Sequence, residues 1–297
     1  MDKSRYYFSA VSAFAIWGLF SLALRPIKEF PPLEILFFRV IACLALLCFV
    51  VFVVRREAVG QMKALLRSMM PHMRRKLILW NLLAGLLLTT NWFLFIYVMN
   101  FVSVKATSLA YLVCPILTAM LAGLLLKEQI KKLQWMALLV GATGCAMLAS
   151  GHLMDLLLSI LIALSYAFYL IIQKKNSGLD SFVVLTFHVT IAVLCLLPLI
   201  PFFGVGVPVE GKFYLFIVII AIFFTIVPMF LSLFSLKGIK GSAVGMLMNI
   251  NPIIAFSLSV FYFREDADAW QYAAYCVVFV SVLLFNLPAI FDRRKAA

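Results

Sequence analysis

The sequence predicts an all-α integral membrane protein with ten transmembrane helices, arranged as two inverted five-helix repeats. Of 297 residues, 65% are hydrophobic and only 12% are charged, with a mean hydropathy of +1.11, which is more apolar than a water-soluble domain can bury. Apolar runs able to cross ~30 Å of hydrocarbon recur along the whole chain. Because these runs lack the period-two alternation of barrel strands, they indicate helices, whose backbone groups bond within the segment.

Ten such runs follow one another along the chain. The first run follows Lys3 and Arg5 as a signal peptide would. No small-x-small cleavage site precedes the turn RPIKEF, so we expect this run to remain as a helix. The expected spans are residues 6–24, 33–54, 78–101, 103–126, 131–150, 153–173, 181–203, 213–235, 240–263 and 269–288.

Lysine and arginine are unevenly distributed between the two sides of this predicted topology. Most of the 25 basic residues fall in loops on the same side as the N-terminus. Positive charges stay cytoplasmic, so we expect both termini in the cytoplasm. The net charge of +13 is then a topology signal, and no nucleic-acid partner is expected.

A basic segment at residues 55–77 separates the second and third spans. Its apolar side chains recur at helical spacing, at Met62, Leu65, Leu66, Met69 and Met73. This pattern predicts an interfacial helix on the anionic lipids of the cytoplasmic face. The alternative is a solvated loop whose charges only fix the topology.

The sequence lacks the residue patterns of the common intramembrane enzymes. Its six cysteines all lie within expected spans and have no metal-ligand spacing, so we interpret them as small core residues and expect no metal site. The three histidines form no H-E-x-x-H motif, and no mid-membrane aspartate pair or Gly-rich phosphate loop occurs. We therefore expect no enzyme, no cofactor and no ATP-driven pumping by this chain alone.

The two halves of the chain match one another at two offsets. At an offset of 137, KATSLAYLVCPILTAMLAGLLLKEQIKKLQW resembles GSAVGMLMNINPIIAFSLSVFYFREDADAW, which aligns Pro115, Lys127 and Glu128 with Pro252, Arg264 and Glu265. At an offset of 149, LEILFFRV (33–40) matches FVVLTFHV (182–189) and IWGLF (16–20) matches SYAFY (165–169). The two offsets differ by 12 residues, and we interpret this difference as an insertion in the basic segment of the first half. The halves are therefore about 1–150 and 151–297.

Five helices per half is an odd number, so the second half enters the membrane inverted relative to the first. Inverted repeats related by an axis in the membrane plane are the architecture of alternating-access transporters, and they place the substrate site near the midplane between the halves. The sequence therefore predicts a secondary transporter.

The run NWFLFIYVMNFVSVKATSLAYLVCPILTAMLAGLLLKEQIKKLQW (91–135), LEILFFRV and the five-plus-five helices resemble the drug/metabolite transporter superfamily, in particular its EamA-domain, RarD-like branch. The likeness covers nearly the whole chain. It implies a multi-pass permease of the bacterial cytoplasmic (inner) membrane, usually an exporter of small metabolites or drugs such as amino acids or related compounds.

Arg39 is the leading candidate for substrate contact, because ionisable residues inside membrane spans are rare and functional. Its forked, permanently charged guanidinium suits a carboxylate or another acceptor. The alternative is a structural pairing, for instance with Glu34 or a helix C-terminus. At the offset of 149, Arg39 corresponds to His188, the only histidine inside an expected span. His188 is the candidate proton carrier if transport is proton-coupled, although a packing role is the simpler interpretation.

Further candidates are polar or aromatic residues at depths where membrane spans are normally apolar. Asn91, Trp92, Tyr111, Trp17 and Asn249 are expected to line the substrate site, although membrane helices also use asparagine and aromatic side chains for packing. Trp17 has Tyr166 as its repeat partner. Pro115 and Pro252 each remove a helical hydrogen bond and free a carbonyl at matching depths, and they are the candidate hinges.

A flippase for a lipid-linked or phosphate-bearing amphiphile is the alternative function, because Arg39 could bind a phosphate as readily as a carboxylate. A channel is less favoured, since no ring of charges or filter-like motif is visible. The sequence leaves open the substrate, the coupling ion and whether the protein is a monomer or a homodimer.

Overall fold

The computed structural model describes residues 3–102, 104–149, 153–264, 266 and 268–294, and within these ranges the chain is helical, with no strand. Eight helical segments are long and apolar enough to cross a membrane, and two shorter apolar helices cover Leu109–Leu125 and Lys132–Leu148. The ten expected spans coincide with these ten segments. The all-helical class is confirmed for the described residues, while the number of membrane crossings stays a prediction.

Several of these segments consist of more than one helix. The first half contains α1 (Ser4–Gly18), α2 (Phe20–Leu24), α3 (Pro32–Phe49), α4 (Arg56–Ser68), α5 (Pro71–Phe101), α6 (Val104–Leu125) and α7 (Lys132–Ala149). The second half contains α8 (Leu153–Lys175), α9 (Ser181–Leu196), α10 (Gly211–Ala221), α11 (Val227–Ser235), α12 (Gly241–Leu247), α13 (Ile250–Ser257) and α14 (Ala269–Arg294). Short 3₁₀ segments cover Arg25–Ile27 and Leu197–Phe203, and π-helical segments cover Val50–Val54, Ile222–Ile226 and Leu258–Tyr262.

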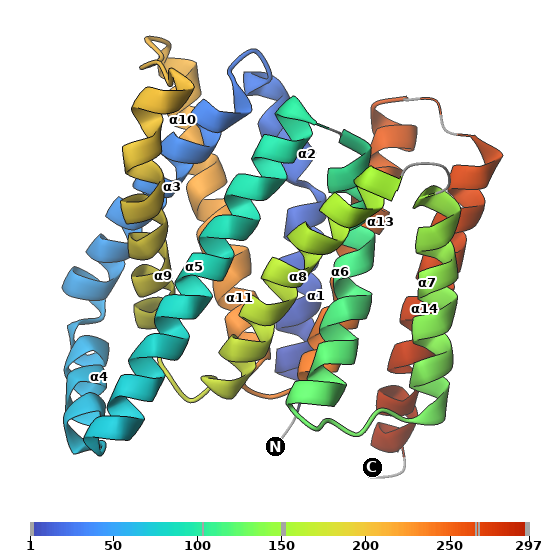
Figure 1. The fold of residues 1–297 in the computed structure, drawn as a ribbon, viewed down its shortest axis with the longest axis horizontal. Coiled ribbons are helices and arrows are strands. Elements are labelled where there is room, and N and C mark those ends of the chain that lie inside the picture. The colour runs from blue at the N-terminus through green and yellow to red at the C-terminus, as the bar shows by residue number, and fades with distance from the viewer. Residues whose placement is uncertain (1–2, 103, 150–152, 265, 267, 295–297) are drawn as a thin grey trace.

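The basic segment forms a separate helix over only part of its expected length. α4 ends at Ser68, and residues 71–77 are the first turns of α5. Pro71 explains the division, because proline is favoured in the first turn of a new helix and disfavours helical backbone in the residue before it. Arg55, just before α4, forms an ion pair with Asp180 at 3.3 Å. Figure 1 shows α4 beside the start of α5, at the end of the bundle where α1 begins and α14 finishes.

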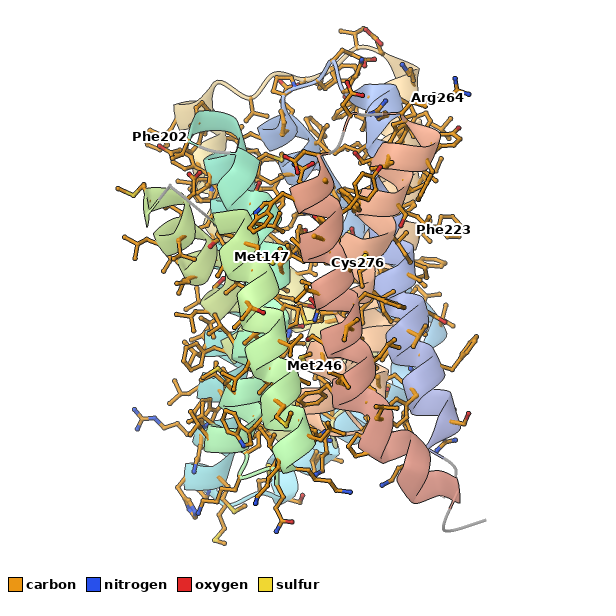
Figure 2. All side chains as sticks on the ribbon, turned by 90° about the vertical axis from the view of Figure 1, so that its right-hand side faces the viewer. Met147, Phe202, Phe223, Met246, Arg264 and Cys276 are labelled. Atoms are coloured by element: carbon orange, nitrogen blue, oxygen red, sulfur yellow. The ribbon has the colours of Figure 1, made fainter. Side chains whose placement is uncertain are left out.

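Two turns at opposite ends of the molecule share an unusual backbone conformation. Lys127 and Arg264 have φ values of 54° and 55°, and they are the only described non-glycine residues with positive φ. Residues other than glycine seldom adopt this left-handed backbone conformation. The two residues are repeat partners at the offset of 137. The α6–α7 turn lies at the end where the chain begins (Figure 1), and Arg264 lies at the opposite end (Figure 2).

α7 and α14 run side by side and pack closely through small residues (Figure 2). A Cβ added to Gly141 would lie 2.7 Å from Ser281 Oγ, and one added to Gly144 would lie 2.9 Å from Val278 Cγ2. At the offset of 137, Gly141 corresponds to Val278 and Gly144 to Ser281. Each glycine therefore meets the partner of the other, which is the reciprocity that a twofold axis between two halves produces.

Candidate functional site

Arg39 points into the helix bundle from the eighth residue of α3. Ile41, two residues later, is 40% exposed on the outer face, and two residues in an α-helix differ by about 200° in direction. Arg39 Nε is buried and has no hydrogen-bond partner among the described residues. The guanidinium carbon lies 5.3 Å from the centre of the Trp92 ring on α5, within the range of a cation–π interaction.

No carboxylate among the described residues pairs with Arg39. Glu34, the partner considered from the sequence, accepts a hydrogen bond from the Gly206 N–H at 3.0 Å instead. The titratable groups that act electrostatically on the guanidinium are the Cys43 thiol and the Tyr111 hydroxyl. Arg39 is thus a cation inside the bundle without a described counter-ion.

Tyr111 shows that the interior of the bundle has accessible space. It lies on the buried face of α6, one turn from Thr107 and Pro115, which are both buried. Nevertheless 40% of its surface is exposed. Val113, about 200° around the helix, lines an apolar groove of about 370 Å³ between α6, α7 and α8 instead. Tyr111 acts electrostatically on Arg39 and on Tyr166, so its exposed surface faces the interior of the bundle.

An aromatic series connects the two halves of the chain. Trp17 on α1 meets its repeat partner Tyr166 on α8 edge-on, with ring centres 6.5 Å apart. The Tyr166 ring lies 5.6 Å from the Tyr169 ring, and the Tyr169 ring lies 5.5 Å from the His188 ring, measured between ring centres. Trp17 Nε1 also donates a hydrogen bond to the Phe224 carbonyl at 2.9 Å. Repeat partners that touch each other lie near the axis relating the halves, which is where the sequence places the substrate site.

His188 is fully buried, and neither ring nitrogen has a hydrogen-bond partner among the described residues. Its described ring contacts are with Tyr169 and Phe187. The described contacts of Arg39 lead to α5 and α6 instead, so they do not bring these two repeat partners together.

The two candidate asparagines make packing contacts in this conformation. Asn91 Nδ2 donates to the Ile162 carbonyl at 2.9 Å and to Ser165 Oγ at 3.2 Å, which links α5 to α8. Asn249 is 1% exposed and donates to the Met246 carbonyl at 3.3 Å, while its Oδ1 has no described partner. Asn91 therefore holds α5 against α8, and it is partly exposed. Asn249 has almost no accessible surface in this conformation.

The two candidate hinge prolines differ in their surroundings. α6 continues through Pro115, which cannot donate a hydrogen bond to the Tyr111 carbonyl. Pro252 follows a break between α12 and α13, where the Asn251 N–H donates to the Met248 carbonyl at 3.1 Å. The sequence predicted a freed carbonyl at both positions. In the second half this is wrong, because the chain tightens locally and supplies another donor.

Sequence reasoning missed a contact between the halves at the end of the bundle where the chain begins. Glu128, after α6, accepts hydrogen bonds from Gly241 N at 2.7 Å, Ser242 N at 3.0 Å and Ser242 Oγ at 2.6 Å, at the start of α12. Lys240 Nζ donates to the Gln129 carbonyl at 3.0 Å beside it. We call the Glu128 contacts with Gly241 and Ser242 the Glu128 latch. The match between the Lys127–Glu128 and Arg264–Glu265 pairs in the two repeats could have drawn attention to Glu128. Glu265 lies outside the described residues.

Comparison with known proteins assigns the family. The model of the EamA-like transporter family matches residues 4–150 and again 153–287. The chain belongs to this family. An EamA-like transporter is a membrane permease, and the resemblance to the RarD-like branch of the drug/metabolite transporter superfamily is confirmed by its relatives.

Those relatives match over nearly full length. The chain is 28% identical to the uncharacterized transporter YojE of Bacillus subtilis, covering 99% of this chain and 97% of that protein. It is 28% identical to Protein RarD of Streptomyces exfoliatus, covering 96% and 89%, and 23% identical to Protein RarD of Escherichia coli, covering 97% and 96%. A crystal structure of a protein 17% identical to this EamA-like transporter superposes over 100% of both chains with a TM-score of 0.74, which shows a shared fold.

Proposed function

We propose that this permease is a secondary transporter that exports small organic metabolites or drugs by alternating access. The central observation is that Trp17 and Tyr166, repeat partners from the two halves, meet inside the bundle. Arg39, Trp92 and the exposed surface of Tyr111 also lie inside the bundle, on α3, α5 and α6. Arg39 has no described counter-ion there. A site between two inverted halves can open to either side as the halves rock against each other.

The proposed topology has ten spans in two inverted repeats, 1–150 and 151–297, with both termini in the cytoplasm. Support comes from the two separate family matches, the matched turns at Lys127 and Arg264, and the reciprocal contacts of Gly141 and Gly144. Under this orientation the Glu128 latch joins the halves at the cytoplasmic end, so that end is closed in this conformation. The bacterial relatives favour the bacterial cytoplasmic membrane.

α4 is proposed to contact anionic lipids at the cytoplasmic face. Its exposed Lys63 and Arg67 offer positive charge, and Leu65 is 39% exposed. Arg55 instead ties the start of this helix to the protein through Asp180.

Counterflow in proteoliposomes tests the carrier mechanism. Compounds that stabilise the purified protein, drawn from amino acids, related drugs, organic acids and lipid phosphates, are labelled and supplied outside vesicles preloaded with the same unlabelled compound. We expect preloading to produce a transient internal accumulation of label, because each reorientation exchanges one bound molecule for another. Labelled influx that is independent of preloading would indicate a channel. Exchange confined to lipid phosphates would favour the flippase, since Arg39 also suits phosphate.

His188 remains the candidate for proton coupling, because no other histidine of the sequence lies deep in a described span. For a carrier coupled through this ring, counterflow and net uptake by His188→Gln lose the pH dependence of the wild type. An unchanged pH profile removes this role and leaves His188 as a packing residue against Tyr169.

A further inference from the structure

The charge at the centre of the bundle constrains the cargo of the proposed transporter. Arg39 is the charged residue that the described part of the chain places on the interior surface, with Trp92 and Tyr111 beside it. Its guanidinium has no salt bridge or hydrogen bond to any described residue. Arginine does not lose its proton in proteins, so the interior carries a fixed positive charge.

A cation held away from bulk water is costly unless an anion or several acceptors face it. In this conformation the protein supplies the Trp92 ring, which offsets only a small part of that cost. Neighbouring Cys43 and Tyr111 carry no fixed negative charge. The remaining compensation must come from water or from the bound molecule.

The guanidinium also presents free donors. Nε is buried and has no hydrogen-bond partner in the described part of the chain. The two Nη nitrogens also make no hydrogen bond to a described residue, but they are not fully buried. They therefore keep accessible surface. A carboxylate or phosphate can accept two parallel hydrogen bonds from such a fork. Around it, Trp92, Tyr111, Trp17 and Tyr166 provide flat apolar surface for the rest of a small molecule.

Net charge then separates the possible cargo classes. An anion neutralises Arg39, whereas a neutral compound leaves its charge unpaired and an organic cation adds a second one. A zwitterionic amino acid brings a carboxylate but also an ammonium group, for which the described residues place no carboxylate beside Arg39. We propose that the central site takes a small organic anion with a flat apolar body, its acidic group bound by Arg39; this inference rests on the proposed transport function.

A charge-matched ligand series tests the proposal. Phenylacetate, phenylacetamide, phenethylamine and phenylalanine share a phenyl ring and differ in charge; benzoate and phenyl phosphate extend the anionic arm. Binding to the protein in nanodiscs is followed by tryptophan fluorescence, with Trp92→Phe identifying the signal from the site. We expect the carboxylates to bind at least about tenfold more tightly than phenylacetamide, the loss typical of a charge-assisted hydrogen bond. Phenethylamine and phenylalanine should bind more weakly still.

Variants of Arg39 connect this preference to its cause. Arg39→Gln should bind phenylacetate and phenylacetamide equally, whereas Arg39→Lys should keep the preference for the anion with weaker affinity, because its charge remains and the fork is lost. Arg264→Gln removes an exposed basic residue at the end of the molecule and should leave the series unchanged. Phenyl phosphate binding better than every carboxylate would keep the anion site and point to phosphate-bearing cargo.

Equal binding of phenylacetamide or phenethylamine and the carboxylates by wild type would overturn the proposal. Retention of the carboxylate preference by Arg39→Gln, or the absence of binding by every anion of the series, would also overturn it. Counterflow of labelled phenylacetate separates this inference from the transport proposal. Anion binding that depends on Arg39 without counterflow contradicts transport, while counterflow of neutral or cationic compounds alone contradicts the anion site.

Discussion

Replacing Glu128 by alanine should open the end of the bundle at which the chain begins. The Glu128 carboxylate accepts three hydrogen bonds at the start of α12, and this latch joins the two halves. Hydrogen bonds to charged groups contribute about 1.5–3 kcal/mol each, and water can replace part of this at an exposed end. We expect the open form to gain about 1–3 kcal/mol, a shift of roughly fivefold to more than a hundredfold in its population.

A cysteine reporter measures this opening. Ala122 is fully buried and lies beside Gly241, so Ala122→Cys in a background without the native cysteines should react faster with a water-soluble maleimide when the latch is removed. Glu210→Ala is the matched control, because Glu210 precedes α10 without making a side-chain cap hydrogen bond. An unchanged labelling rate in Glu128→Ala would show that the latch does not hold this end closed.

Gly144→Val should destabilise the whole protein by separating α7 from α14. A Cβ at this position would lie 3.2 Å from the Ala274 carbonyl oxygen and 2.9 Å from Val278 Cγ2, so the two helices must move apart. Overpacking of this kind typically costs about 1–3 kcal/mol. The expected result is a lower midpoint of thermal unfolding for the purified protein in detergent.

Ala142→Val provides the comparison on the same helix. Ala142 is exposed and lines the outer apolar groove, where added methyl groups find space. Its midpoint should stay close to that of the wild type. Similar losses in both variants would mean that helix propensity, and not the close approach of α7 and α14, determines the effect.

Hydropathy predicted the positions of the helical segments because a membrane requires long apolar helices regardless of their packing. It did not predict their internal interruptions. α1 ends at Gly18, and α12 ends at Leu247, five residues before Pro252. At this level α1 and α13 approach so closely that a Cβ on Gly18 would lie 2.6 Å from Ile254 Cβ. Such breaks depend on which helices cross, and apolar periodicity carries no information about crossings.

The candidate site was predictable where repeat partners could be compared. Matching IWGLF with SYAFY paired Trp17 with Tyr166, and these rings meet in the structure. Arg39 was conspicuous as a charge in an apolar run, but its contact with Trp92 joins α3 to α5 and required the fold. Asn249 was proposed from its polarity and its depth in an expected span, and its burial could not be anticipated because asparagine also packs between membrane helices.

The latch and the central residues have different consequences for transport. Arg39 and the aromatic side chains around it act on the bound molecule, whereas Glu128 acts on the equilibrium between conformations. A ligand moves that equilibrium only by its differential affinity for the two states. Variants of Arg39 should therefore change which compounds are carried, and variants of Glu128 should change how often the site reaches the cytoplasmic side.

Locking the latch tests alternating access most directly. Glu128→Cys and Ser242→Cys, in a background without the native cysteines, place two thiols where the carboxylate now meets the Ser242 hydroxyl at 2.6 Å. A short bis-methanethiosulfonate reagent forms a disulfide with each thiol, releasing methanesulfinate, and so joins them across the two halves by a link that a reductant cleaves. We predict that cross-linking stops counterflow, that reduction restores it, and that ligand binding from the opposite side persists throughout. Counterflow that continues in the fully cross-linked protein would contradict transport by alternating access.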